Sequence, residues 1–156
     1  MKKIMCGLLL LGATASGMDY QALGMLETGN HDAQIGTHGE ICRFQMLKPN
    51  WRKYARKGES RLNPVDAEKV ARRYMADLTE QFVEVYHRQP NDFEEYRLWN
   101  SPNAILEGQP VTPAVADRAT RYRNLVEMYN DERISQRPVT HPAPRLRATN
   151  SVSRHP

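Results

Sequence analysis

The sequence predicts a mainly α-helical domain with one small irregular or β excursion around residues 36–48. Two segments, which follow Asn63-Pro64 and Thr112-Pro113, carry apolar residues at steps of three and four, as one face of a helix requires. In both segments a capping residue precedes a proline, a pattern typical of helix starts. The excursion contains turn-forming glycines and ends before a proline, so the helical pattern is interrupted there.

The N-terminal residues 1–17 are interpreted as a secretory signal peptide. Lys2 and Lys3 precede an apolar run over residues 4–11, and small residues follow it. This run is too short to span a membrane, so we expect no transmembrane segment after signal cleavage and a periplasmic or secreted protein. Cys6 leaves with the signal peptide, and Cys42 then stands alone, so the mature chain forms no internal disulfide. We interpret Cys42 as a small buried hydrophobe.

The net charge of +4 belongs to the two ends of the chain. The expected domain, residues 18–134, is nearly neutral, whereas residues 135–156 contain four arginines and no acid. This tail is rich in proline, serine and threonine and is expected to be disordered. It could bind an anionic polymer or only keep the chain soluble. The domain has no basic stripe with interleaved aromatic residues, which argues against a nucleic-acid partner.

The first expected helix ends at Gly29 and carries Glu27 on its last turn. Leu23 lies one turn earlier and Leu26 is adjacent, so this carboxyl group sits at the edge of an apolar face. Partial burial and the negative end of the helix dipole both favour the protonated form. A general acid needs that form near neutral pH. The competing interpretation is an ordinary solvated glutamate near a helix end.

The next elements follow the excursion. Residues 40–47 are expected to form a short strand or hairpin arm, and residues 50–55 a short helix. A long helix then runs from Asn63-Pro64 to before Pro90, with an apolar stripe made of Ala71, Tyr74, Leu78, Phe82 and Val85.

Two further helices complete the domain. Asp92 is expected to cap a short helix that ends after Trp99, with Glu95 completing a capping box. The last helix begins at Thr112-Pro113 and reaches about Asn130.

Three short phrases stand in a fixed order along the chain. They are Leu26-Glu27-Thr28-Gly29, then Gly36-Thr37-His38-Gly39-Glu40-Ile41-Cys42-Arg43-Phe44-Gln45, then Tyr96-Arg97-Leu98-Trp99-Asn100-Ser101-Pro102. Together they resemble the soluble-type lytic transglycosylases of the lysozyme-like superfamily, which are related to goose-type lysozyme. That family shows a helix ending in Glu-Ser/Thr-Gly, a Gly-x-x-Gly-x-x-Gln segment and an aromatic-Asn-Ala-Gly segment. The resemblance covers residues 19–130 and implies an α+β lysozyme-like fold.

The resemblance also implies an enzyme that cleaves the β-1,4 glycosidic bonds of peptidoglycan glycan strands, without a cofactor. Glu27 matches the catalytic general acid/base of the family. Gln45, Trp99 and Asn100 match residues that line the substrate cleft, and Glu40 is a second acid within reach of it. The basic tail is then a candidate contact for anionic wall polymers.

The chain departs from the family pattern at three positions. Trp99 stands where tyrosine is usual, so a hydrogen bond from a phenol to the cleft is missing or made differently. Cys42 replaces a glycine, and Pro102 stands where a glycine often follows the asparagine.

Three functional alternatives therefore stay open. A lytic transglycosylase needs one carboxylate, because the muramic acid C6 hydroxyl replaces water and closes an anhydro ring. A lysozyme-type hydrolase, or a glycosidase acting on chitin-like polymers, needs Glu40 or Asp32 as a second carboxylate. The third alternative is a non-catalytic cell-wall-binding or scaffold protein that retains the lysozyme-like fold. We expect no metal site, because the spacing of His31, Asp32 and His38 matches no standard ligand pattern.

Overall fold

The computed structural model describes residues 17–136, and the domain is mainly α-helical over this range. Six helices follow one another: α1 (Tyr20–Thr28), α2 (Lys48–Tyr54), α3 (Pro64–Tyr86), α4 (Asp92–Asn100), α5 (Pro102–Leu106) and α6 (Pro113–Ser135). The expected signal peptide and the expected tail lie outside the described residues, apart from Gly17, Ser135 and Gln136.

The two helix starts that combine a cap with a proline are confirmed. The Asn63 side chain accepts hydrogen bonds from the backbone N–H groups of Val65 and Asp66 at the start of α3. The Thr112 hydroxyl caps α6 in the same way. Both helices have proline as their first residue, where a missing N–H has no consequence. The last helix is one turn longer than expected, since α6 continues beyond Asn130 to Ser135.

The expected cap of the fourth helix was wrong by one residue. Asn91, not Asp92, is the N-cap of α4, and Glu94, not Glu95, completes the capping box. Asn91 and Asp92 are both good capping residues, so the local pattern does not choose between them. With Asn91 as the cap, Glu95 turns into the interior, where only 4% of its surface is exposed.

The excursion contains almost no β structure. Ile41 and Met46 form one isolated antiparallel bridge, with two backbone hydrogen bonds of 2.9 Å. The four residues between them form a tight turn in which Cys42 and Gln45 have positive φ angles of 60° and 51°. The chain therefore reverses direction within four residues and forms no β-ladder. Of the two predicted forms of the excursion, irregular or β, the irregular one is correct, and residues 40–47 form no strand.

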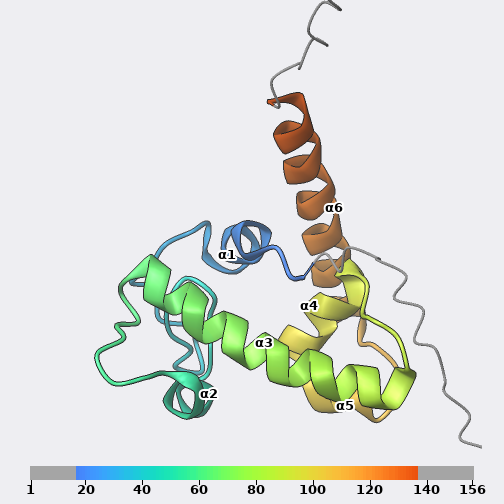
Figure 1. Ribbon diagram of the computed structural model, residues 1–156, viewed down its shortest axis with the longest axis horizontal. Helices are drawn as coiled ribbons and strands as arrows, with labels where there is room; N and C mark the ends of the chain where they lie inside the picture. The colour runs from blue at the N-terminus through green and yellow to red at the C-terminus, as the bar shows by residue number, and fades with distance from the viewer. Residues whose placement is uncertain (1–16, 137–156) are drawn as a thin grey trace, which may run out of the picture.

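The core lies between α3 and the surrounding helices. Figure 1 shows α3 crossing the body, with α1 and α2 towards its first half and α4 and α5 towards its second. An aromatic series runs through the interior, with edge-to-face or tilted contacts between neighbours, in the order Tyr20, Phe44, Trp99, Tyr74 and Tyr54. This series joins α1, the turn, α4, α3 and α2 into one core.

The apolar stripe of α3 was right except at its last position. Val85 is 51% exposed, whereas Phe82 is fully buried. Tyr86, four residues after Phe82, takes the inward position instead, because its hydroxyl donates a 2.6 Å hydrogen bond to the carbonyl oxygen of Ile105 in α5.

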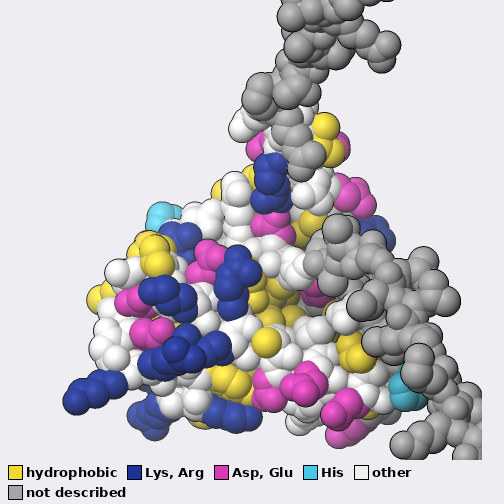
Figure 2. Space-filling model, in the orientation of Figure 1, with side chains coloured by type: hydrophobic (Ala, Val, Ile, Leu, Met, Phe, Trp, Pro, Cys, Tyr) yellow, Lys and Arg dark blue, Asp and Glu magenta, His cyan; other side chains and the backbone are white. Residues whose placement is uncertain are grey.

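Charge is distributed unevenly although the domain is nearly neutral. Residues 48–73, which form α2, the following loop and the first half of α3, contain nine basic and three acidic residues. Figure 2 shows lysine and arginine side chains gathered over this end of the molecule. None of the helices within residues 17–136 combines the length and apolar character that crossing a membrane requires.

Candidate active site

The five candidate site residues line one groove with a volume of about 620 Å³. Glu27 comes from α1, Glu40 and Gln45 from the turn region after it, and Trp99 and Asn100 from the end of α4. The structure thus brings together all the side chains that the three sequence phrases nominated.

Glu27 owes its position to the way α1 ends. Gly29 adopts the left-handed conformation (φ 63°) and its N–H bonds back to the helix, which ends α1 at Thr28. The Thr28 hydroxyl donates to the carbonyl oxygen of Arg43 at 2.9 Å and accepts from the His31 N–H at 3.1 Å. Thr28 therefore fixes the end of α1 against the 41–46 turn and holds Glu27 at the wall of the groove.

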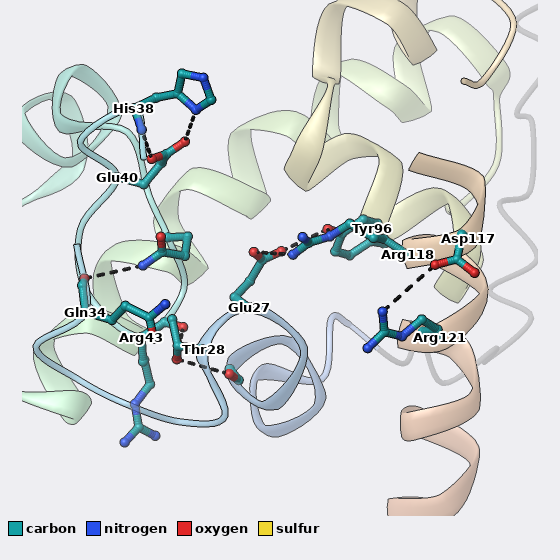
Figure 3. A network of polar contacts seen from close by, with 12 residues as sticks. Glu27, Thr28, Gln34, His38, Glu40, Arg43, Tyr96, Asp117, Arg118 and Arg121 are labelled. Atoms are coloured by element: carbon teal, nitrogen blue, oxygen red, sulfur yellow. Dashed lines mark hydrogen bonds and ion pairs between the residues drawn. The ribbon is translucent and has the colours of Figure 1, made fainter. Parts of the chain in front are cut away.

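The Glu27 carboxylate belongs to a closed network with Tyr96 and Arg118. The Tyr96 hydroxyl donates to Glu27 Oε1 at 2.9 Å, and Arg118 Nη2 donates to Glu27 Oε2 at 2.6 Å. Arg118 Nε donates to the Tyr96 hydroxyl at 2.6 Å, which completes the ring of contacts. In Figure 3, Glu27 lies between this pair and the side of the groove that carries Glu40.

Burial dominates the electrostatics of Glu27. Its side chain is only 8% exposed, and loss of solvation raises the pKa of this carboxyl group above its ordinary value. The positive charge of Arg118 and the hydrogen bond from Tyr96 act in the opposite direction, and the negative charge of Glu40 adds to the rise in pKa. The balance shifts Glu27 towards the protonated form, the direction expected from the sequence, with burial as the leading cause.

Glu40 has the opposite electrostatic environment. Hydrogen bonds from its own backbone N–H and from the His38 N–H, the latter at 2.9 Å, hold the pKa of this carboxyl group below its ordinary value. Its carboxylate also faces the His38 ring, with 3.3 Å between Oε1 and Nδ1. Glu40 is therefore a stable anion at the rim of the groove.

Gly36 allows the two side chains of the turn to approach each other. A Cβ atom at this position would overlap both Gln45 Oε1 and Glu40 Oε2, so any larger residue would make the ends of these two side chains turn away. The Gln45 amide donates to the carbonyl oxygens of Gln34 and Cys42 at 3.3 and 3.2 Å. These bonds fix the Gln45 side chain over the turn.

Trp99 and Asn100 differ in what they can offer a ligand. Trp99 is 7% exposed and packs edge-to-face against Phe44 and Tyr74, so it forms the floor of the groove rather than an open stacking surface. Asn100, the last residue of α4, is exposed and available for hydrogen bonding.

The departures from the family pattern have local explanations. Cys42 has the positive φ that a glycine adopts without strain, and its side chain is buried, as expected. Pro102 is the first residue of α5, a favourable place for proline. Trp99 has no phenol, and the phenol hydrogen bond to Glu27 in this structure comes from Tyr96, one helical turn earlier.

Sequence reasoning missed Tyr96 and Arg118 as site residues. Tyr96 precedes Trp99 by three residues, so the two share a helix face, and that spacing was the available signal. Arg118 lies four residues before the buried Tyr122, so the two share one face of α6 and Arg118 puts a positive charge on the face that packs inward. An arginine on an apolar stripe is unusual and was the second available signal.

The structure places Asp32, a candidate second acid, outside the groove. Asp32 forms an ion pair with Arg43, with 2.5 Å between Oδ1 and Nε, and is not among the residues lining the groove. Within residues 17–136, no group of three histidine, cysteine or acidic side chains is arranged to hold a metal ion. Comparisons with protein-family models, curated proteins and solved structures gave no match.

Proposed function

We propose that this domain is a lysozyme-like glycosidase that cleaves the glycan strands of peptidoglycan, with Glu27 as general acid/base. The observation that carries the proposal is the buried Glu27 carboxyl group, which has a raised pKa and opens onto the groove shared with Gln45 and Asn100. The three sequence phrases that resemble lytic transglycosylases supply the side chains of this groove.

The two acids of the groove fit different roles. Burial raises the pKa of Glu27, which suits it to protonate a departing glycosidic oxygen. Hydrogen bonding lowers the pKa of Glu40, which suits it to remain an anion. Two carboxyl groups with pKa values moved apart are the pattern that assigns acid and base in glycosidases. Asp32 does not line the groove and pairs with Arg43 instead, so it is not our candidate for the second acid.

Two reaction outcomes are compatible with this pair. In a lytic transglycosylase, Glu27 first protonates the leaving oxygen and then takes a proton from the muramic acid C6 hydroxyl, which closes an anhydro ring. In a hydrolase, Glu40 orients a water molecule that attacks the sugar instead. We favour the transglycosylase, since Glu40 is already occupied by the His38 N–H and the His38 ring.

The partner and the compartment follow from the same proposal. The substrate is peptidoglycan, and the apolar N-terminal segment would direct the chain to the periplasm or the exterior. The basic end formed by residues 48–73 would favour association with an anionic wall.

One structural observation favours the non-catalytic alternative, a wall-binding protein that retains the fold. Arg118 contacts Glu27 directly and stabilises its charged form, which opposes general-acid catalysis. The experiment that separates the alternatives is digestion of purified sacculi by wild-type protein, by Glu27→Gln and by Glu132→Gln, an exposed control on α6.

The products decide between the candidate functions. A transglycosylase leaves anhydromuramoyl ends, and a hydrolase leaves reducing ends, which mass spectrometry distinguishes. We expect anhydro ends from the wild type and from Glu132→Gln, and none from Glu27→Gln. Undiminished lysis by Glu27→Gln would refute the catalytic assignment, and glycan binding without any product would support the wall-binding protein.

A further inference from the structure

Arg118 is the only lysine or arginine that lines the groove within the described part of the chain. Its side chain is 39% exposed, although it contacts the buried carboxylate of Glu27. The groove therefore presents one positive charge to any ligand, directly beside the acid.

The guanidinium group of Arg118 is only partly used by the protein. Of its five N–H donors, one on Nε bonds to Tyr96 and one on Nη2 bonds to Glu27. The other three, including both on Nη1, have no acceptor within residues 17–136. Because the first two contacts fix the plane of the group, the remaining donors are held in place for a planar anion such as a carboxylate.

We propose that Arg118 binds a carboxylate carried by the muramoyl residue of the substrate, so that the groove selects peptidoglycan over neutral chitin-like glycans. This inference rests on the proposed function. The carboxylate has two sources, the peptide stem of an intact strand and the lactyl group that remains when an amidase removes the stem. Within the protein, Arg118 bonds only to Glu27 and Tyr96 among the described residues, so its other three N–H donors can bind a ligand.

Binding at this position would also act on Glu27. A ligand carboxylate shares the positive charge of Arg118 and adds a second negative charge close to Glu27, and both effects favour the protonated acid. The charged and titratable groups that face Glu27 are Arg118, Tyr96 and Glu40. Since Glu40 is an anion with or without a ligand, the ligand carboxylate is the new negative charge near Glu27. Binding of a negatively charged substrate would thus favour the protonated form of Glu27, which is the form that cleaves the glycosidic bond.

The test measures binding in a background that cannot turn over. Glu27→Gln, Glu27→Gln/Arg118→Gln and Glu27→Gln/Arg121→Gln are titrated with three soluble probes: peptide-bearing glycan strands, amidase-stripped strands and chitohexaose. Arg121 is the matched control, because it lies one turn along α6, pairs with Asp117 at 3.9 Å and does not line the groove. Circular dichroism establishes that each variant is folded, and Arg118→Lys in the same background restores the charge without the planar fork.

Loss of Arg118 is expected to weaken binding of charged strands by roughly 10- to 100-fold, as for one charge-assisted hydrogen-bonded pair, and to leave chitohexaose binding unchanged. The Arg121 variant should match its parent with every probe, and the lysine variant should recover part of the loss. A loss confined to peptide-bearing strands identifies the stem as the source, a loss confined to stripped strands identifies the lactyl carboxylate, and a loss with both shows that Arg118 accepts either carboxylate.

An equal change for charged and neutral probes, or no change for either, overturns the role of Arg118 while leaving the proposed function intact. Failure of Glu27→Gln to bind any of the three probes overturns both.

Discussion

Replacing Glu95 with glutamine should stabilise the domain in alkaline solution and leave its stability unchanged in acid. Glu95 is 4% exposed, and burial, together with the negative charge of Asp92, raises its pKa from 4.5 to about 8. Its nearest donor is the Tyr122 hydroxyl, at 3.4 Å. A neutral amide keeps the size of the side chain and its acceptor oxygen, but it removes the ionisation.

The size of the effect follows from the raised pKa. In the unfolded chain Glu95 ionises near 4.5, and in the folded domain near 8. The folded state holds the proton over this interval, so the wild type loses stability as the pH rises from 4.5 to about 8. At about 1.4 kcal/mol per pKa unit, the loss amounts to about 5 kcal/mol. That is a large fraction of the total stability of a domain of this size.

The assay is urea unfolding of wild type and Glu95→Gln at pH 4 and pH 9. The two free energies of unfolding should be similar at pH 4, and the variant should be more stable at pH 9. Asp92→Asn should reduce the pH dependence of the wild type, because Asp92 contributes to the raised pKa of Glu95. Glu132→Gln, on the exposed side of α6, is the control and should follow the wild type. If the free energy of unfolding changed equally between pH 4 and pH 9 in the wild type and in Glu95→Gln, burial would not raise the pKa of Glu95, and the argument would be refuted.

Three further predictions concern the groove and its support. Tyr96→Phe should lower the free energy of unfolding by about 1.5–3 kcal/mol, the value of a hydrogen bond to a charged group, in urea titrations. The hydrogen bond from Tyr96 lowers the pKa of Glu27, so its loss should raise that pKa further. The alkaline limb of the pH–rate profile for glycan cleavage should then move to higher pH. An unchanged limb would show that Tyr96 does not influence Glu27. Thr28→Val removes the bond to the Arg43 carbonyl and should cost about 1–2 kcal/mol in the same titration. Gly36→Ala makes the ends of the Gln45 and Glu40 side chains turn away; because both ends are flexible, glycan binding measured by calorimetry should weaken by less than about tenfold, that is, by less than about 1.4 kcal/mol.

The parts of the fold that the sequence predicted well depend on local chemistry. Asn63-Pro64 and Thr112-Pro113 define helix starts because the cap and the fixed φ of proline act within one turn. The start of α4 was misplaced because Asn91 and Asp92 satisfy the same local rule. The choice between them depends on which side chains of α4 face the core, and that is a tertiary property.

The candidate site shows the same division. The groove residues expected from the three phrases do lie together. The contact between Glu27 and Arg118 joins residues 91 positions apart, and no local pattern relates them. Tyr96 lay within the third phrase, yet only its position in space shows that its hydroxyl bonds to Glu27.

The packing of Trp99 gives the domain an optical reporter. The chain contains two tryptophans, of which Trp51 lies half-buried on α2 and Trp99 forms the floor of the groove. Trp51→Phe would leave a single indole that packs against Phe44 and Tyr74 and lines the groove. Its fluorescence would register the arrival of a ligand in real time, without turnover and without an added dye.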